Sequence, residues 1–146
     1  MGCRAIVLLG VVLAAGGGSD DAVKKELKKF QGTWKVVRMQ VDGVKIPLEA
    51  FDKTTVVVEG DKFSFRDKGR VYEEIEVVLD LAKKPREIDL HFVTGLKKGV
   101  TEKGLYELDG NTLKICQSLN LKKRPTELES GKGSAQQLMV LKRQPG

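Results

Sequence analysis

Histidine and cysteine, on which many metal and catalytic sites depend, are almost absent from this sequence. The 146 residues include one histidine, His91, and two cysteines, Cys3 and Cys116. A His-rich metal site or a CxxC site is thereby excluded. Any Ser-His-Asp triad would depend on His91, which strand alternation places on the more polar side of its segment. We therefore expect no metal, no cofactor and no catalytic residue, and we predict that the protein is not an enzyme.

Aromatic residues and clustered charges are also scarce. Aromatic residues make up 5% of the chain, and the net charge of +6 comes from lysines dispersed among acidic residues. A protein that follows a phosphate backbone normally gathers its basic residues on one face or interleaves them with aromatics. We therefore expect no nucleic-acid binding.

The sequence has no internal repeat and no linker. This predicts a single domain, which we expect to be monomeric.

Long hydrophobic stretches are limited to one, at the N-terminus. Ile6–Ala15 is an uninterrupted apolar run, too short to cross a bilayer, which takes about 20 residues. Arg4 precedes the run, the small residues Gly16–Ser19 follow it, and polarity begins at Asp20. This order is typical of a secretory signal peptide. It predicts a signal peptide over 1–19, cleavage between Ala15 and Ser19, and export to the periplasm or outside the cell.

Two lipid-anchor readings compete with simple export. A lipoprotein needs a cysteine just after the apolar run, but Cys3 precedes it. Acylation of the N-terminus would favour Ser or Thr at position 6, where Ile6 stands. We therefore expect no stable membrane anchor after cleavage.

The mature chain keeps only Cys116, which excludes an internal disulfide. Its apolar strand predicts a small buried side chain, with a reactive thiol or intermolecular bridge as the alternative.

The remaining residues, 20–146, are expected to form one helix followed by strands. A helix should begin at Asp20 or Asp21, with an apolar stripe of Val23, Leu27 and Phe30. A second, very short helical segment is expected at Leu48–Phe51. The predicted strands are Thr33–Val41, Thr54–Val58, Lys62–Arg66, Arg70–Leu79, Glu87–Val93, Gly104–Leu108, Thr112–Gln117 and Gln136–Lys142. Turn signals separate them, so they should form an antiparallel meander. About eight strands is the number at which such a meander closes into a barrel.

Several stretches resemble a known group of proteins. They are Phe30–Val36 with its Gly-x-Trp, Lys83–Leu90, Tyr106–Cys116 and Arg124–Glu127. In this order they resemble a family of small, secreted, uncharacterised lipocalin-like domains that is expanded in planctomycete bacteria. The resemblance runs from about Lys24 to Arg143. It implies an all-β, eight-stranded, up-and-down barrel like that of the lipocalin and fatty-acid-binding superfamily, with a short N-terminal helix. It brings no catalytic residue with it.

A closed barrel of this kind has an interior to which alternate strand residues point. The residues expected to line that lumen and contact a ligand are Trp34, Phe63, Phe65, Glu73, Val77, Phe92 and Tyr106. Glu73 falls on the apolar side of its strand, where it is either a polar anchor for a ligand or a residue near the barrel rim. Tyr72, in contrast, is expected on the solvent face with Glu74 and Glu76.

Trp34 is also expected to have a structural role. Lipocalin-like barrels commonly lay a basic side chain from the last strand across this tryptophan. The resemblance therefore implies Lys142 or Arg143 in that position, with Arg124 as the third candidate. Such a cation–π contact contributes about 0.5–2 kcal/mol.

Two functions follow from these expectations. The first is non-catalytic binding of a small apolar or amphipathic ligand in the lumen. The second is a protein–protein interaction or inhibitor module that acts through the open-end loops Leu48–Lys53 and Asn120–Ser134. The low aromatic content favours a lumen filled by aliphatic side chains and thus the second function, whereas the lipocalin resemblance favours the first.

Overall fold

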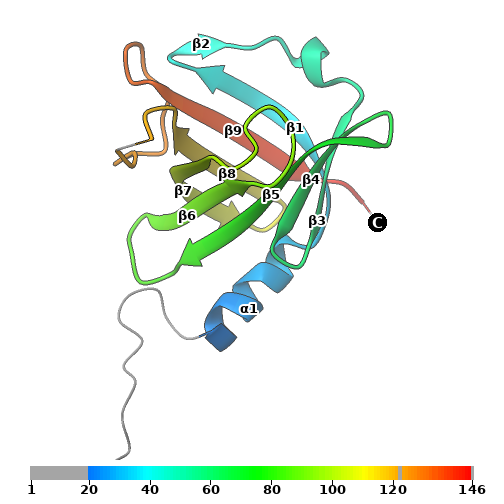
Figure 1. The fold of residues 1–146 in the computed structure, drawn as a ribbon, viewed down its shortest axis with the longest axis vertical. Coiled ribbons are helices and arrows are strands. Elements are labelled where there is room, and N and C mark those ends of the chain that lie inside the picture. Colours follow the sequence, from blue (N-terminus) through cyan, green and yellow to red (C-terminus); the bar gives the residue numbers. More distant parts are fainter. Residues whose placement is uncertain (1–19, 122, 146) are drawn as a thin grey trace, which may run out of the picture.

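The computed structural model describes residues 20–121 and 123–145. The predicted signal peptide, residues 1–19, lies outside them. The described chain forms a barrel of strands with one helix across its lower end (Figure 1). None of the described helices is both long enough and apolar enough to cross a membrane.

The elements match the predicted order closely. The helices are α1 (Asp20–Phe30) and the 3-10 turn η1 (Leu48–Phe51). The strands are β1 (Gly32–Val41), β2 (Val44–Lys45), β3 (Thr54–Glu59), β4 (Lys62–Asp67), β5 (Arg70–Asp80), β6 (Arg86–Phe92), β7 (Thr101–Asp109), β8 (Thr112–Ser118) and β9 (Gln136–Arg143). Only the two-residue β2 has no counterpart among the predicted strands.

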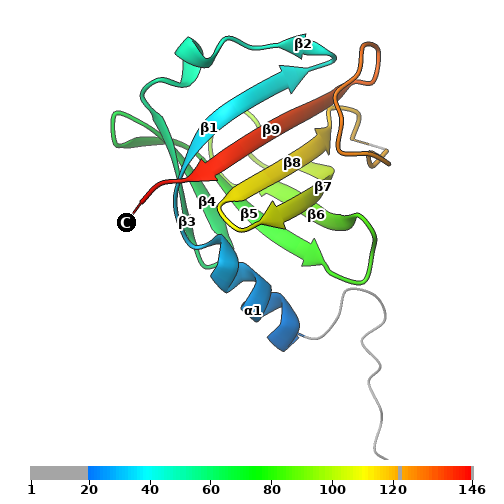
Figure 2. The ribbon, with the colours of Figure 1, turned by 180° about the vertical axis from the view of Figure 1, so that it is seen from behind.

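The sheet closes on itself through its first and last long strands. Neighbouring strands pair antiparallel from β3 to β9, and β1 pairs with both β3 and β9. Figure 2 shows β1 and β9 running side by side where the barrel closes. The short β2 pairs only with β1, so it lies outside the ring of eight. The predicted eight-stranded antiparallel barrel is confirmed.

Strand alternation explains where the core lies. In β3 the β-branched sequence Thr54-Thr55-Val56-Val57-Val58 buries every second residue, and Val56 and Val58 are almost inaccessible to solvent. Branched side chains suit a pleated surface of this kind. The same period of two along the other strands directs one face of each into a single apolar core.

Helix α1 covers one end of this core. Its first turn carries Asp20 and Asp21 and its last turn Lys28 and Lys29, which complements the helix dipole. Phe30 is fully buried, with ring centroids 6.1 Å from Phe63 and 5.3 Å from Tyr106. Val23 and Leu27 pack against the core as the predicted stripe requires. The helix nevertheless also buries Glu26, a carboxylate that the stripe does not include.

A β-bulge in β5 changes the expected orientation of one residue. Phe65 pairs with Glu73 but Arg66 pairs with Val71, which leaves Tyr72 as an extra residue on β5. Two residues then oppose one, so the alternation shifts by one position at the bulge. Val71 now pairs with Arg66 and is 45% exposed, and Tyr72, although 48% exposed, is one of the residues that line the interior pocket described below. Tyr72 is thus exposed to solvent as expected, but it lies at the pocket and not on the face that carries Glu74.

Some apolar side chains on the outer face of the barrel are buried as well. Cys116, Leu138 and Val140 form a small second cluster, with Leu128 of the β8–β9 loop packed against it. The thiol of Cys116 donates a hydrogen bond to the Glu129 carbonyl (3.3 Å). Cys116 is therefore a buried side chain beneath a surface loop, and it does not reach the lumen.

Candidate functional site

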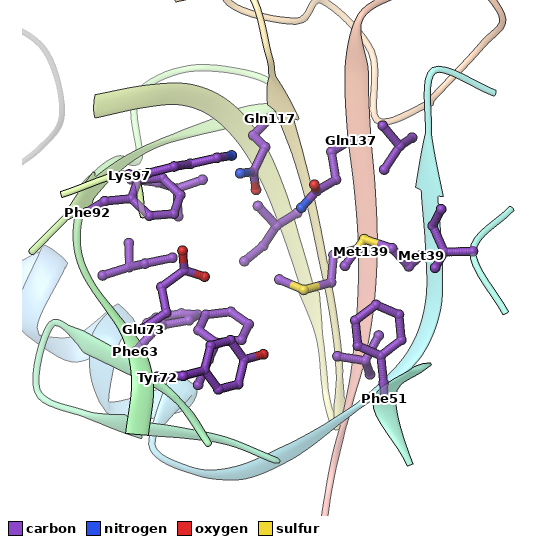
Figure 3. A pocket seen from close by; sticks show the side chains of 17 residues that line it. Met39, Phe51, Phe63, Tyr72, Glu73, Phe92, Lys97, Gln117, Gln137 and Met139 are labelled. Atoms are coloured by element: carbon purple, nitrogen blue, oxygen red, sulfur yellow. The ribbon is translucent and has the colours of Figure 1, made fainter. Parts of the chain in front are cut away.

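The barrel interior contains a pocket at the end opposite α1. Its volume is about 320 Å³, and Figure 3 shows side chains from several strands around it. Its apolar wall consists of Val36, Met39, Val41, Ile46, Phe51, Phe63, Phe65, Ile75, Leu90, Phe92, Ile115 and Met139. Sites for small molecules are concave, mostly apolar and about 300–1,000 Å³ in volume. This pocket lies at the lower end of that range.

The seven predicted lumen residues divide into two groups. Phe63, Phe65, Glu73 and Phe92 line the pocket. The other three, Trp34, Val77 and Tyr106, are buried in the core but do not line it. A period of two determines which side chains point inward, but it does not say at what height along the barrel axis each one lies.

Tyr106 illustrates this difference in height. Its hydroxyl donates a hydrogen bond to the Glu26 carboxylate of α1 (2.9 Å), and Arg86 is also paired with that carboxylate. Burial, followed by the hydrogen bond to Glu26, raises the pKa of the Tyr106 hydroxyl. Tyr106 therefore fastens the helix to the barrel at the closed end, instead of offering a polar contact in the pocket.

An ion pair that was not predicted from the sequence lies at the pocket wall, where Lys97 lines the pocket and Glu102 is buried behind the lining. Lys97, in the β6–β7 loop, places its Nζ 2.6 Å from Oε1 of Glu102. The other oxygen of Glu102 accepts a hydrogen bond from the Gln117 amide (2.5 Å). Glu102 is buried and therefore has both oxygens partnered. Its position two residues before Gly104 and four before the inward Tyr106 was a signal that could have found it.

Glu73 is the second carboxylate of this site. It is half-buried, and Figure 3 shows its carboxylate directed into the pocket. Among the described residues it has no hydrogen bond or ion pair. Burial raises the pKa of the Glu73 carboxyl, with Lys97 acting in the opposite direction and Glu102 in the same one. An acid that is partly removed from water and has no protein partner is free to accept a hydrogen bond from a donor on a ligand.

Gly95 allows the β6–β7 loop to lie close to this acid. Its φ of +91° is in the region that favours glycine. A Cβ added there would lie 3.2 Å from the Tyr72 carbonyl oxygen and 3.6 Å from Cγ of Glu73. The loop that carries Lys97 therefore approaches β5 as closely as it does because residue 95 has no side chain.

The three basic candidates for the Trp34 contact occupy different places. The Arg143 guanidinium lies over the Trp34 ring, with Cζ 4.3 Å from the ring centroid. Lys142 is exposed. Arg124 lies on the outer wall of the barrel, where it donates to the Gly104 carbonyl (2.9 Å) and pairs with Asp89 (2.6 Å).

His91 and the loops complete the set of predicted positions. His91 is exposed, and its Nδ1 lies 2.8 Å from the Thr101 hydroxyl. Within Leu48–Lys53, Phe51 lines the pocket while Leu48 is exposed. In the described part of Asn120–Ser134, Leu121 is exposed. A protein-interaction role for these loops stays a prediction.

The fold and the site together define a small antiparallel β-barrel whose interior holds an apolar pocket with acidic and basic groups. This architecture is compatible with a lipocalin-like fold. Comparisons with protein-family models, curated proteins and solved structures found no match to this chain. The resemblance to the planctomycete domain family therefore stays a prediction.

Proposed function

We propose that this protein binds a small apolar or amphipathic molecule, without chemical conversion, in the barrel lumen. The observation that carries the proposal is the pocket of about 320 Å³ with its largely apolar wall. Displacing water from such a wall supplies free energy for binding, at about 25 cal/mol for each Å² of apolar surface buried. The polar groups at Glu73 and Gln137, which also line the pocket, would orient the ligand.

Two methionines give the pocket wall an adaptable part. Met39 of β1 and Met139 of β9 are partners in the strand pairing, and both side chains line the pocket. Methionine is flexible and polarizable, so it adjusts to apolar ligands of different outline. This composition supports binding of a class of apolar chains more than recognition of a single rigid compound.

Export forms part of the proposal. The Arg4, apolar-run and small-residue order of the N-terminus supports a protein that meets its ligand in the periplasm or outside the cell. In those compartments a poorly soluble ligand would require a carrier.

A neutral apolar dye tests the proposal. Nile red should bind the protein saturably with one dye per chain, gain fluorescence, and be displaced by octanol. Phe65→Trp adds volume inside the pocket and should weaken dye binding. Val78→Trp is the matched control, because Val78 is on the outer face of β5 and 65% exposed. Binding is followed by dye fluorescence and not by the intrinsic fluorescence of Trp34, because Trp34 does not line the pocket.

The result that contradicts the proposal is equally definite. If circular dichroism shows both variants to be folded and they bind the dye as the wild type does, the lumen is not the binding site. If the wild-type protein binds no dye and shows no change in melting temperature with any apolar compound, ligand binding in the lumen is refuted.

A further inference from the structure

The charges inside the pocket do not cancel. Lys97 is the basic residue of the pocket lining, and its Nζ is already paired with Glu102 at 2.6 Å. Glu73 is the acidic residue of that lining and has neither an ion pair nor a hydrogen bond among the described residues. When Glu73 is ionised, Glu73 and the buried Glu102 together carry two negative charges against the one positive charge of Lys97, so one negative charge is left without an ion-pair partner.

The ion pair with Glu102 keeps Lys97 from binding an anionic ligand. Glu102 is buried, and Gln117 donates to its second oxygen at 2.5 Å. If Lys97 turned toward an anionic ligand, the buried Glu102 carboxylate would lose its counter-charge. Breaking a partly buried pair in this way is costly, because an unpaired charge remains away from water.

Aromatic rings flank the unpaired acid. Phe65 is directly opposite Glu73 in the strand pairing, and Tyr72 precedes Glu73 at the bulge. The rings of Phe65 and Tyr72 lie 6.4 Å apart, centroid to centroid, and both line the pocket. The negative face of an aromatic ring attracts a cation. An acid beside two such rings is the combination that recognises an ammonium group.

We infer that the pocket selects amphipathic ligands whose polar head is a protonated amine. This inference rests on the proposed lumen binding. The ammonium group would donate hydrogen bonds to the Glu73 carboxylate beside Phe65 and Tyr72. The apolar tail would lie against the methionines Met39 and Met139. A fatty acid would instead bring a second negative charge next to Glu73.

Three ligands with one chain length test this selection. Octylamine, octanoic acid and octanol are titrated into the full-length protein near neutral pH, and the binding constants are measured by calorimetry. Octylamine should bind at least about tenfold more tightly than octanoic acid, which is the effect of one hydrogen bond to a charged group. Octanol should fall between them, because it carries no charge.

Glu73→Gln identifies the residue responsible. The substitution should weaken octylamine binding about tenfold and leave octanol binding within about twofold. Glu74→Gln is the matched control, since Glu74 is the adjacent acid, does not line the pocket, and lies 3.9 Å from Lys62. It should leave the binding of all three ligands unchanged.

The pH dependence supplies a second readout. Octylamine stays protonated to about pH 10, as a lysine side chain does. Its affinity should therefore rise with pH as Glu73 ionises. The titratable groups that face Glu73 are Tyr72 on its own strand, Lys97 in the β6–β7 loop and Glu102 on β7. Glu73→Gln keeps all three, so a flat profile in this variant assigns the rise to Glu73.

The outcomes separate the two proposals. Binding of none of the three compounds overturns the proposed function and the inference with it. Binding of octanoic acid as tightly as octylamine, or octylamine binding that is insensitive to Glu73→Gln, overturns the amine selectivity alone and leaves lumen binding intact.

Discussion

The guanidinium of Arg143 lies over the indole of Trp34, with Cζ 4.3 Å from the ring centroid. The same guanidinium donates hydrogen bonds to the backbone carbonyls of Lys29 and Gln31. The indole Nε1 of Trp34 donates to the Phe30 carbonyl at 2.8 Å. The last strand is thereby joined to the junction between α1 and β1, at the end of the barrel that the helix covers.

Arg143→Lys should destabilise the protein by about 1–2 kcal/mol, because a lysine cannot reproduce the planar stack and its two carbonyl contacts. Lys142→Met is the control, since the neighbouring Lys142 is exposed, and it should change stability by less than about 0.5 kcal/mol. Trp34→Ala should cost about 3–5 kcal/mol. Urea denaturation measures all three. If Arg143→Lys and Lys142→Met lowered the free energy of unfolding equally, the contact between Arg143 and Trp34 would not stabilise the barrel.

Stability should fall at alkaline pH because of Tyr106. Its hydroxyl is buried and bonded to Glu26, which raises its pKa from the ordinary value of 10.0. As the pH rises above 10.0, the unfolded chain releases this proton while the folded chain keeps it, so the free energy of unfolding decreases. Tyr106→Phe should flatten this decrease in urea titrations. Tyr72→Phe should flatten it less, because Tyr72 is 48% exposed. Identical slopes for both variants and the wild type would refute this assignment.

Glu73→Gln should stabilise the protein near neutral pH. The pKa of Glu73 is raised from its ordinary value of 4.5, mainly by burial. Below pH 4.5 the acid is protonated in both the folded and the unfolded chain, so it does not lower the free energy of unfolding. As the pH rises through the raised pKa, the unfolded chain ionises more readily than the folded chain, and the free energy of unfolding decreases. The melting temperature of Glu73→Gln should exceed that of the wild type at about pH 7, and the difference should vanish at about pH 4. A constant difference across this range would argue against the titration of Glu73. A residue kept at a cost to stability is expected of a binding site.

The Cys116 thiol should be inert in the folded protein. It is fully buried, and burial raises its pKa, which disfavours the reactive thiolate. In a Cys3→Ser background, a thiol reagent at about pH 8 should label Cys116 only after denaturant is added. Thr126→Cys places an exposed thiol on the β8–β9 loop and should react at once. Rapid labelling of native Cys116 would show that this loop opens readily.

The N-terminal segment should be removed on export. N-terminal sequencing of the native protein is expected to begin between Gly16 and Asp21, after the small residues that follow the apolar run. Recovery of an intact Met1, or of lipid attached to Cys3, would contradict the signal-peptide interpretation.

Much of the barrel follows from local patterns in the sequence. The period of two in stretches such as Thr54–Val58, with turn signals such as Asp109-Gly110, is sufficient to place eight strands in an antiparallel order. These signals are local because a strand's two faces and a tight turn depend on adjacent residues. The inward direction of Phe63, Phe65 and Phe92 was predictable for the same reason.

The site depended on contacts between distant residues. Alternation could not distinguish Trp34 and Tyr106, which fill the helix-covered end, from Phe65 and Phe92, which line the pocket. Height along the barrel axis is set by strand tilt and register around the whole ring. The bulge at Tyr72, where one residue of β4 opposes two of β5, likewise exists only in the paired sheet.

Buried charge was the feature least visible in the sequence. Glu26 is buried because Arg86, 60 residues away, and Tyr106 satisfy its carboxylate. Glu102 is buried because Lys97 and Gln117, which line the pocket, satisfy its carboxylate from that side. A carboxylate enters a protein interior only where partners compensate its lost hydration. The sequence by itself determined the strands and their inward faces, whereas the tertiary structure decided which acids are paired and left Glu73 without a partner.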